Sequence, residues 1–242
     1  ILGVSVMAAL GAVLSLYFGV SDRAPWLLPA AAMAGAILGV CLLLGLSGLA
    51  ASTITFVVAG IILQNIGGSL VALALSLAPN PWATQEIIDW LMGSLADRSI
   101  DEVRIAAPFI LIGLGLIYSM RRALDALTLG EATAASLGVN LKRAQILLVL
   151  GIGLATGATV AVTGVISFVG LIVPHILRPF TTGEPGKLLL PSALGGAVLV
   201  LAADILVRLT PAAAEVKLGV AMAILGGPFF FATLLSMRRK SA

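Results

Sequence analysis

Apolar segments of similar length follow one another along this sequence, and they restrict its possible folds more than any other feature. A helix needs about 20 apolar residues to cross a bilayer, and turn residues separate the segments. Charged residues make up 10% of the chain, against about 25% in soluble domains. We therefore expect an all-α membrane protein, a polytopic helical bundle forming a single transmembrane domain over residues 1–242. The predicted spans are roughly 1–20, 27–46, 54–78, 103–120, 144–164, 165–180, 188–209 and 216–237.

The number of spans depends on residues 144–180, which are too long for one helix and contain Pro174 in a short second part. With eight spans, nine basic residues lie on one side of the membrane and five on the other. By the positive-inside rule, the nine mark the cytoplasm, which then holds both chain ends. Merging 144–180 into one span leaves six inside and eight outside, so we expect eight spans. The nine are Arg121, Arg122, Lys142, Arg143, Arg178, Lys187, Arg238, Arg239 and Lys240, and the five are Arg23, Arg98, Arg104, Arg208 and Lys217.

Residues 121–143 form the one long polar interruption, which this topology places in the cytoplasm. We expect two short helices there, at about 123–127 and 129–137. Thr128 followed by Glu131 fits a capping box at the start of the second helix, and Gly138 is typical of a helix stop. Small residues between them (Ala132, Ala134, Ala135) indicate a surface for contact with another protein. The alternative, to which we give equal weight, is that residues 121–143 are a solvated connector with helical propensity.

A second polar stretch, residues 79–102, alternates acidic and apolar side chains and includes two tryptophans. This pattern predicts an amphipathic piece at the outer membrane interface, either an interfacial anchor or part of the wall of a substrate path. Within the spans, Gly35 with Gly39 and Gly153 with Gly157 have the spacing that lets helix backbones approach closely in lipid.

Polar groups inside the spans are few. Gln64 and Asn65 lie near the middle of the third span and either bond between helices, which we favour, or line a hydrophilic passage. Asp204 and Arg208 are four residues apart, so they can pair on one helix face. They lie at the outer end of the seventh span, as an anchoring ion pair or as a basic tip that receives an acidic partner.

Catalytic and metal-binding patterns are weak. His175 is the only histidine and Cys41 the only cysteine, which argues against a metal centre or a disulfide framework. Gly45-Leu46-Ser47-Gly48 matches the G-x-S-G of rhomboid-type intramembrane proteases, with His175 as a possible base, but such short matches are common in Gly-rich helices. The sequence contains no phosphate-binding loop, and its formal charge of +3 indicates no nucleic-acid partner.

Several stretches together resemble the FecCD-type permease subunits of type II ABC importers, a family that includes iron–siderophore, haem and vitamin B12 permeases. They are ILGVS at 1–5, WLMGSL at 90–95, LGEATAASLGVNLKRAQ at 129–145, VTGVISFVGLIVPHILR at 162–178, ADILVR at 203–208 and AEVKLGVAMAILGGPFFF at 214–231. They occur in family order along the whole chain. The resemblance implies about ten spans in the complete subunit, so we expect N-terminal sequence with two further spans to precede Ile1.

The resemblance also implies roles for particular residues. The two short helices of 121–143 would be coupling helices that sit in a groove of the ATPase subunit. Arg208 would dock an acidic residue of the substrate-binding protein, and Ser52 and Thr53 would lie at a cytoplasmic gate. Gln64 and Asn65 are further pathway candidates because of their polarity within the third span, not because of the resemblance. The coupling residues would be Leu124, Leu127, Leu129, Gly130, Glu131, Ala134, Ala135, Leu137 and Gly138.

We therefore expect the permease subunit of an ATP-driven importer in the bacterial inner membrane, without a cofactor and without ATP hydrolysis of its own. Its partners would be a second permease subunit, two ATP-binding subunits, and a periplasmic or lipid-anchored substrate-binding protein. The expected cargo is a ferric siderophore, haem or a related metal chelate, with cobalamin or an oxyanion left open. The alternative is a stand-alone secondary transporter, which would need ionisable groups near the midplane; every charged residue here falls at a span end or in a loop.

Overall fold

The computed structural model describes residues 3–21, 24, 26–48, 52–181, 183–210 and 216–241. Within these residues all regular elements are helices, which confirms the predicted all-α class. They are α1 (Val4–Tyr17), α2 (Leu27–Ser47), α3 (Thr53–Ser76), α4 (Pro81–Leu91), α5 (Ile100–Ser119), α6 (Arg121–Leu127), α7 (Glu131–Ser136), α8 (Leu141–Thr163), α9 (Val169–Leu177), the 3-10 turn η2 (Arg178–Phe180), α10 (Pro185–Leu209) and α11 (Leu218–Ser241).

Each predicted span coincides with an apolar helix in the described part of the chain. Four helices, α2, α3, α8 and α10, are by themselves long and apolar enough to cross a membrane. α5 passes the same test together with α6, from which it is bent by 47°, and α1, α9 with η2, and α11 are shorter apolar helices. Large apolar side chains on α10, such as Leu194 and Leu201, are 62% and 58% exposed, as expected for a surface that meets lipid. Eight crossings stay a prediction.

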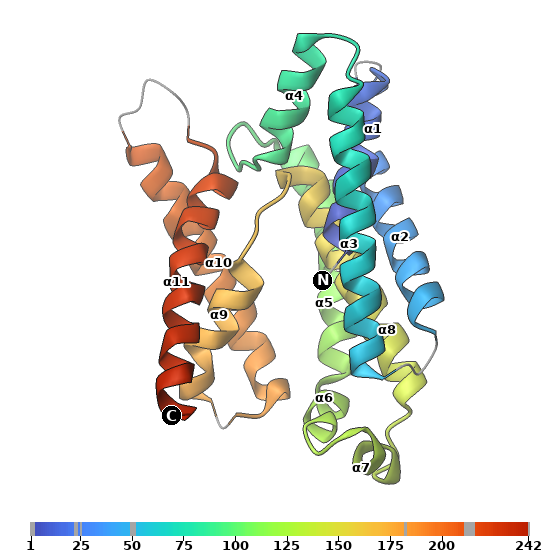
Figure 1. The fold of residues 1–242 in the computed structure, drawn as a ribbon, viewed down its shortest axis with the longest axis vertical. Helices are drawn as coiled ribbons and strands as arrows, with labels where there is room; N and C mark the ends of the chain where they lie inside the picture. Colours follow the sequence, from blue (N-terminus) through green and yellow to red (C-terminus); the bar gives the residue numbers. More distant parts are fainter. Residues whose placement is uncertain are drawn as a thin grey trace.

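The helices form two groups that lie side by side (Figure 1). The first group contains α1, α2, α3, α5 and α8, with α1 at its centre because α2, α3, α4 and α8 all contact it. The second group contains α9, α10 and α11. The short helix α4 lies at one end of the molecule, and α6 and α7 lie at the opposite end.

Glycines let the helices of the first group approach to backbone contact, which confirms the predicted small-residue packing. A Cβ atom on Gly35 of α2 would lie 2.2 Å from the carbonyl oxygen of Met7 in α1. Gly39 also faces Met7, and Cβ atoms on Gly153 and Gly157 of α8 would lie 2.2 Å and 2.5 Å from side chains of α2. No side chain fits at these distances, so all four glycines fix the spacing of α1, α2 and α8.

The two groups are connected through residues 164–168, which are extended between α8 and α9. The predicted sixth span therefore becomes helical only at Val169, because Gly164 (φ 71°) and Phe168 (φ 69°) leave the right-handed helical region. Close backbone contacts hold this segment: a Cβ on Gly93 would lie 2.6 Å from the Val165 carbonyl oxygen, and one on Gly219 would lie 2.7 Å from the same oxygen. We call Gly93, Gly164 and Gly219 the glycine junction.

Candidate functional site

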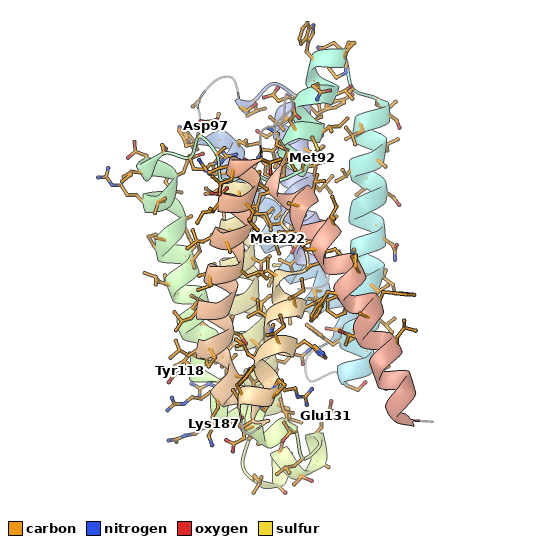
Figure 2. All side chains as sticks on the ribbon, turned by 90° about the vertical axis from the view of Figure 1, so that its left-hand side faces the viewer. Met92, Asp97, Tyr118, Glu131, Lys187 and Met222 are labelled. Atoms are coloured by element: carbon orange, nitrogen blue, oxygen red, sulfur yellow. The ribbon has the colours of Figure 1, made fainter. Side chains whose placement is uncertain are left out.

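The polar stretch 121–143 lies at one end of the molecule. α6, α7, the start of α8 and the start of α10 gather there (Figure 1). Figure 2 shows Tyr118, Glu131 and Lys187 at this end, whereas Met92 and Asp97 lie at the other. Arg23 and the side chains of Arg238, Arg239 and Lys240, which entered the charge count, lie outside the described residues.

The two predicted short helices are present, but the predicted capping box is wrong. The Thr128 hydroxyl donates to the carbonyl oxygen of Asp125 at 2.7 Å, so Thr128 closes α6 and does not open α7. The chain then turns at Gly130 (φ 95°), which is the N-cap of α7 and offers no side chain for capping. α7 consequently begins at Glu131, two residues later than predicted.

The predicted helix stop at Gly138 is confirmed. Gly138 has φ 87°, its N–H donates to the Ala135 carbonyl at 3.0 Å, and the N–H of Val139 donates to the Ala134 carbonyl at 3.0 Å. This pair of bonds is a Schellman motif, which satisfies carbonyls that a helix end otherwise leaves free. The loop therefore has a fixed shape at the end of α7.

The predicted coupling residues divide into an exposed and a covered set. Ala134 is fully buried, so its side chain packs inside the loop, and Leu124 and Leu127 on α6 are half-buried. Leu129 and Leu137 are 62% and 63% exposed, although both are large and apolar. We call the exposed set the loop surface; it comprises Leu129, Gly130, Glu131, Ala135, Leu137 and Gly138.

One contact of this loop escaped the sequence reasoning. Asp125 Oδ1 accepts a hydrogen bond from the backbone N–H of Gly186 at 2.7 Å, so α6 is attached to the first turn of α10. The two residues are 61 positions apart. The predicted span began only at residue 188, so Gly186 was read as part of the preceding turn, and no local signal indicated this contact.

The far end of α10 carries the predicted docking arginine. Arg208 Nε donates to Asp204 Oδ2 at 2.8 Å, which confirms the predicted pairing. The Arg208 side chain is 56% exposed, whereas that of Asp204 is 16% exposed. The covered carboxylate therefore orients the guanidinium, and the bond through Nε leaves the terminal nitrogens able to donate to another carboxylate. Glu215, seven residues on, lies outside the described residues.

The gate candidates lie at the start of α3. The Ser52 hydroxyl caps this helix by accepting from the N–H of Thr55 at 3.3 Å. Thr53 is the first helical residue, and its side chain lies outside the described part. Before them in the chain, at the end of α2, the Gly48 carbonyl accepts from Gln145 Nε2 of α8 at 3.3 Å, so the end of α2 is connected to the start of α8.

Gln64 and Asn65 are the two amide side chains in the middle of α3, for which we favoured bonds between helices. Both are exposed on α3. Asn65 Nδ2 donates to the Ile61 carbonyl of its own helix at 2.9 Å, so this bond lies within α3 and does not join α3 to another described helix. The helix satisfies this amide locally, since the carbonyl four residues back is within its reach.

The residues of the protease alternative are not brought together. Ser47 is buried at the end of α2, where its hydroxyl donates to the Gly48 carbonyl at 3.3 Å. His175 belongs to α9 in the other helix group (Figure 1), with its ring edge-on to Phe229 at 5.8 Å between centroids. Among the described residues, no cluster of three His, Cys, Asp or Glu side chains could hold a metal ion.

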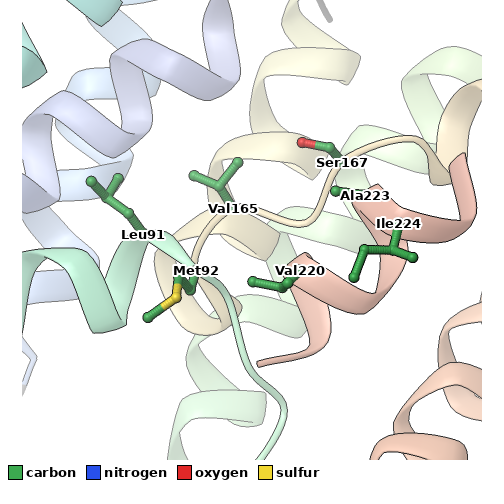
Figure 3. A pocket seen from close by; sticks show the side chains of 8 residues that line it. Leu91, Met92, Val165, Ser167, Val220, Ala223 and Ile224 are labelled. Atoms are coloured by element: carbon green, nitrogen blue, oxygen red, sulfur yellow. The ribbon is translucent and has the colours of Figure 1, made fainter. Parts of the chain in front are cut away.

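An open hollow of about 480 Å³ lies between α4 and α11, beside the extended segment after α8 (Figure 3). Its walls come from the end of α4, the extended segment after α8 and the first turns of α11, and they are largely apolar. The lining residues are Leu91, Met92, Val165, Ser167, Gly219, Val220, Ala223 and Ile224.

Comparison with known proteins decides the family, because the sequence profile of the FecCD transport family matches residues 1–236. This chain belongs to the FecCD transport family. The resemblance seen in the sequence motifs is thereby confirmed. As a FecCD protein with several apolar helices, it is a multi-pass membrane protein.

Two curated FecCD relatives cover nearly all of this chain. BtuC, the vitamin B12 import system permease protein of Vibrio cholerae, is 37% identical over 232 residues, which are 95% of this chain and 69% of BtuC. FecD, the Fe(3+) dicitrate transport system permease protein of Escherichia coli, is 36% identical over 238 residues, or 98% of this chain and 74% of FecD.

A solved structure shares the arrangement of the helices. It shows an inward-facing conformation of a protein assigned to the metal-chelate type of ABC transporter. The TM-score is 0.86 at 26% identity, over 97% of this chain and 75% of that chain.

The function predicted from the sequence is confirmed by these relatives. FecCD proteins are transport permease subunits and not catalytic enzymes, and those of ABC importers work with ATPase and substrate-binding partners. This chain is accordingly the permease subunit of an ATP-driven importer, and the stand-alone secondary transporter is not favoured.

Proposed function

We propose that this FecCD chain forms half of the pathway of a metal-chelate importer in the bacterial inner membrane, as one transmembrane domain with eight spans. Residues 121–143 face the cytoplasm and bind an ATPase subunit, and Arg208 faces outward and docks the binding protein. The complete assembly has two permease subunits, as a homodimer or a paired heterodimer, two ATPases, and one periplasmic or lipid-anchored binding protein.

The observation that carries this proposal is the course of α10. This helix begins beside α6, through the Asp125–Gly186 hydrogen bond, and ends one residue after Arg208. The loop surface and the docking arginine therefore lie at opposite ends of the molecule (Figure 1), as two contacts on opposite sides of a membrane require.

The loop surface supports the ATPase contact for a second reason. Leu129 and Leu137 are apolar and exposed, and they flank α7, whose two ends are fixed by Gly130 and Gly138. Exposed apolar side chains on a rigid support are typical of a protein interface. The permease chain does not catalyse ATP hydrolysis. It contributes contacts whose strength differs between the two shapes of the ATPase.

The polar groups of α3 support a pathway or a subunit interface along this helix. The amide side chains of Gln64 and Asn65 are exposed in the middle of an apolar helix. Contact with lipid is costly for such groups. We place them against the passage or the second permease subunit, with Ser52 and Thr53 at its cytoplasmic gate.

The cargo class follows from the relatives. Vitamin B12 and ferric dicitrate, named for BtuC and FecD, both hold a metal ion inside an organic ligand. We propose a cargo of this kind, such as a ferric siderophore, haem or a corrinoid. The hollow between α4 and α11 supports residues 79–102 as part of the wall of the path, in addition to their interfacial position.

Cysteine crosslinking to the ATPase tests the proposed orientation. In a background with Cys41→Ala, which removes the one cysteine of residues 1–242, Leu129→Cys and Leu137→Cys should each crosslink to the ATPase subunit in the assembled complex. Leu111→Cys is the matched control, because this leucine is 68% exposed on α5 but lies away from the loop. Equal crosslinking from all three positions, or labelling of the loop cysteines from the periplasm, would contradict the proposal.

A further inference from the structure

The contact between α6 and α10 joins the two helix groups at the loop end of the molecule. α10 begins with Pro185, which has no N–H, so the first backbone donor of this helix is that of Gly186. Asp125 Oδ1 accepts from this N–H at 2.7 Å, although Asp125 belongs to α6. A carboxylate at the start of a helix is also favoured by the helix dipole.

The contact is close as well as polar. Gly186 is buried, and a Cβ atom on it would lie 2.5 Å from Asp125 Oδ2 and 2.9 Å from the backbone oxygen of Arg121. The backbone of α6 therefore rests directly on the backbone of α10. The first turn of α10 depends on this support, because Pro191 removes the helix bond to the carbonyl of Lys187.

The remainder of α10 belongs to the second group. A Cβ atom on Gly195 would lie 2.9 Å from the side chains of Val173 and Leu177 in α9. The chain connection from the first group to the second is the segment 164–168, which is not helical between Gly164 and Phe168. A force applied to the loop can therefore reach α9 and α10 through Asp125 more directly than through the chain.

We propose that Asp125 is a positioning residue that fastens the coupling loop to the α9–α11 group, so that a displacement of the loop moves this group against the first one. The inference deepens the proposed function and depends on it. The contact between Asp125 and Gly186 transmits a rigid-body motion because α6 and α10 meet backbone to backbone. Asp125 contributes to the coupling by the amount that the free energy of its contact with Gly186 differs between the two arrangements of the helix groups.

The test uses the complete importer, with permease, ATPase and binding protein reconstituted in lipid. Asp125→Ala removes the acceptor, whereas Asp125→Asn keeps an oxygen that can accept from Gly186. We expect Asp125→Ala to assemble with the ATPase normally and to lose about tenfold in ATP-driven uptake, a typical coupling magnitude. Asp125→Asn should retain most of the uptake.

A distance measurement distinguishes transmission from a loss of folding. Spin labels at Leu111→Cys on α5 and Leu201→Cys on α10, both exposed, report the separation of the two groups in the Cys41→Ala background. We expect this distance to change on addition of nucleotide in the parent protein and in Asp125→Asn, but not in Asp125→Ala. Asp101→Ala is the matched control, since this carboxylate is 80% exposed and pairs only within α5 with Arg104.

Three results would overturn the inference. The first is an unchanged nucleotide response in Asp125→Ala, and the second is an Asn variant as damaged as the Ala variant, which would assign the charge and not the hydrogen bond. The third is failure of Asp125→Ala to assemble with the ATPase, which would make Asp125 a partner contact. The proposed function fails separately, through the crosslinks of Leu129→Cys and Leu137→Cys.

Discussion

At Gly35 the absence of a side chain decides how closely α1 and α2 approach. The hydrogen of Gly35 faces the carbonyl oxygen of Met7, and a methyl group there would lie only 2.2 Å from it. Gly45 belongs to the same helix, but nothing lies within 4 Å of the position its Cβ would take. The two glycines therefore lie in the same helix but differ in packing, so Gly45 is a matched control for Gly35.

This pair gives a prediction about stability. Gly35→Ala should destabilise the permease by about 1–3 kcal/mol, since the added methyl forces α1 and α2 apart. Gly45→Ala should be neutral or stabilising by up to about 1 kcal/mol, because alanine is the better helix former. Thermal unfolding of both variants in detergent checks this. Equal destabilisation of the two would contradict the close contact at Gly35.

Asn65 shows why single polar residues are hard to assign from the sequence. The amide is in the middle of a span, as predicted, but its hydrogen bond goes to Ile61 in its own helix. A local acceptor is always present four residues back in a helix, and periodicity alone does not reveal whether a second helix offers a better one.

Among the helices, two sequence patterns of the same type behave differently. Ser99 and Glu102 form a complete capping box at the start of α5, with the Glu102 side chain accepting from the Ser99 N–H at 2.7 Å. Thr128 and Glu131 have the same spacing and form none. The difference is Gly130, whose positive φ begins α7 without help from a side chain.

The caps give a prediction at this scale. Ser99→Ala should destabilise the start of α5 by about 1 kcal/mol, as for other helix caps. Thr128→Ala should leave the amides at the start of α7 unaffected, because its hydroxyl bonds back to Asp125. Hydrogen exchange of residues 100–104 and 131–134 measures both effects. Faster exchange at 131–134 in Thr128→Ala would contradict this assignment and would indicate that Thr128 does cap α7.

The positions of the helices were largely predictable, and their contacts were not. Span length, Gly and Pro placed all eight apolar helices, since the bilayer leaves the backbone few alternatives. The extended segment before Val169 was not predicted, because a short run of apolar residues is compatible with both a helical and an extended conformation. The Asp125–Gly186 bond was missed since it joins residues 61 apart, and the sequence alone does not place α6 beside α10.

For the whole molecule, α10 sets the distance between the two predicted contacts. Its 25 residues correspond to about 37 Å at the rise of an α-helix, close to the thickness of a membrane with its headgroups. α6 meets its first turn, and the oriented Arg208 stands in its last turn. The ATPase and the binding protein would therefore act on two ends of one helix.

Charge reversal at Arg208 tests the outer contact. Arg208→Glu should weaken docking of the binding protein by about tenfold or more, since it places a negative charge before an acidic partner. Binding of the ATPase should stay unchanged. Arg104→Glu is the matched control, because Arg104 is 75% exposed and pairs with Asp101. Titration of the binding protein onto the permease measures both, and unchanged affinity for Arg208→Glu would remove its assigned role.

The glycine junction has a consequence for how the chain is made. Gly93 follows α4, Gly164 follows α8, and Gly219 is near the start of α11, where its N–H donates to the Gly93 carbonyl at 3.3 Å. These three positions are synthesised at well-separated times, so the contacts among them form only after α11 has been made. Until α11 is in place, the segment 164–168 lacks the close backbone contact between Val165 and Gly219.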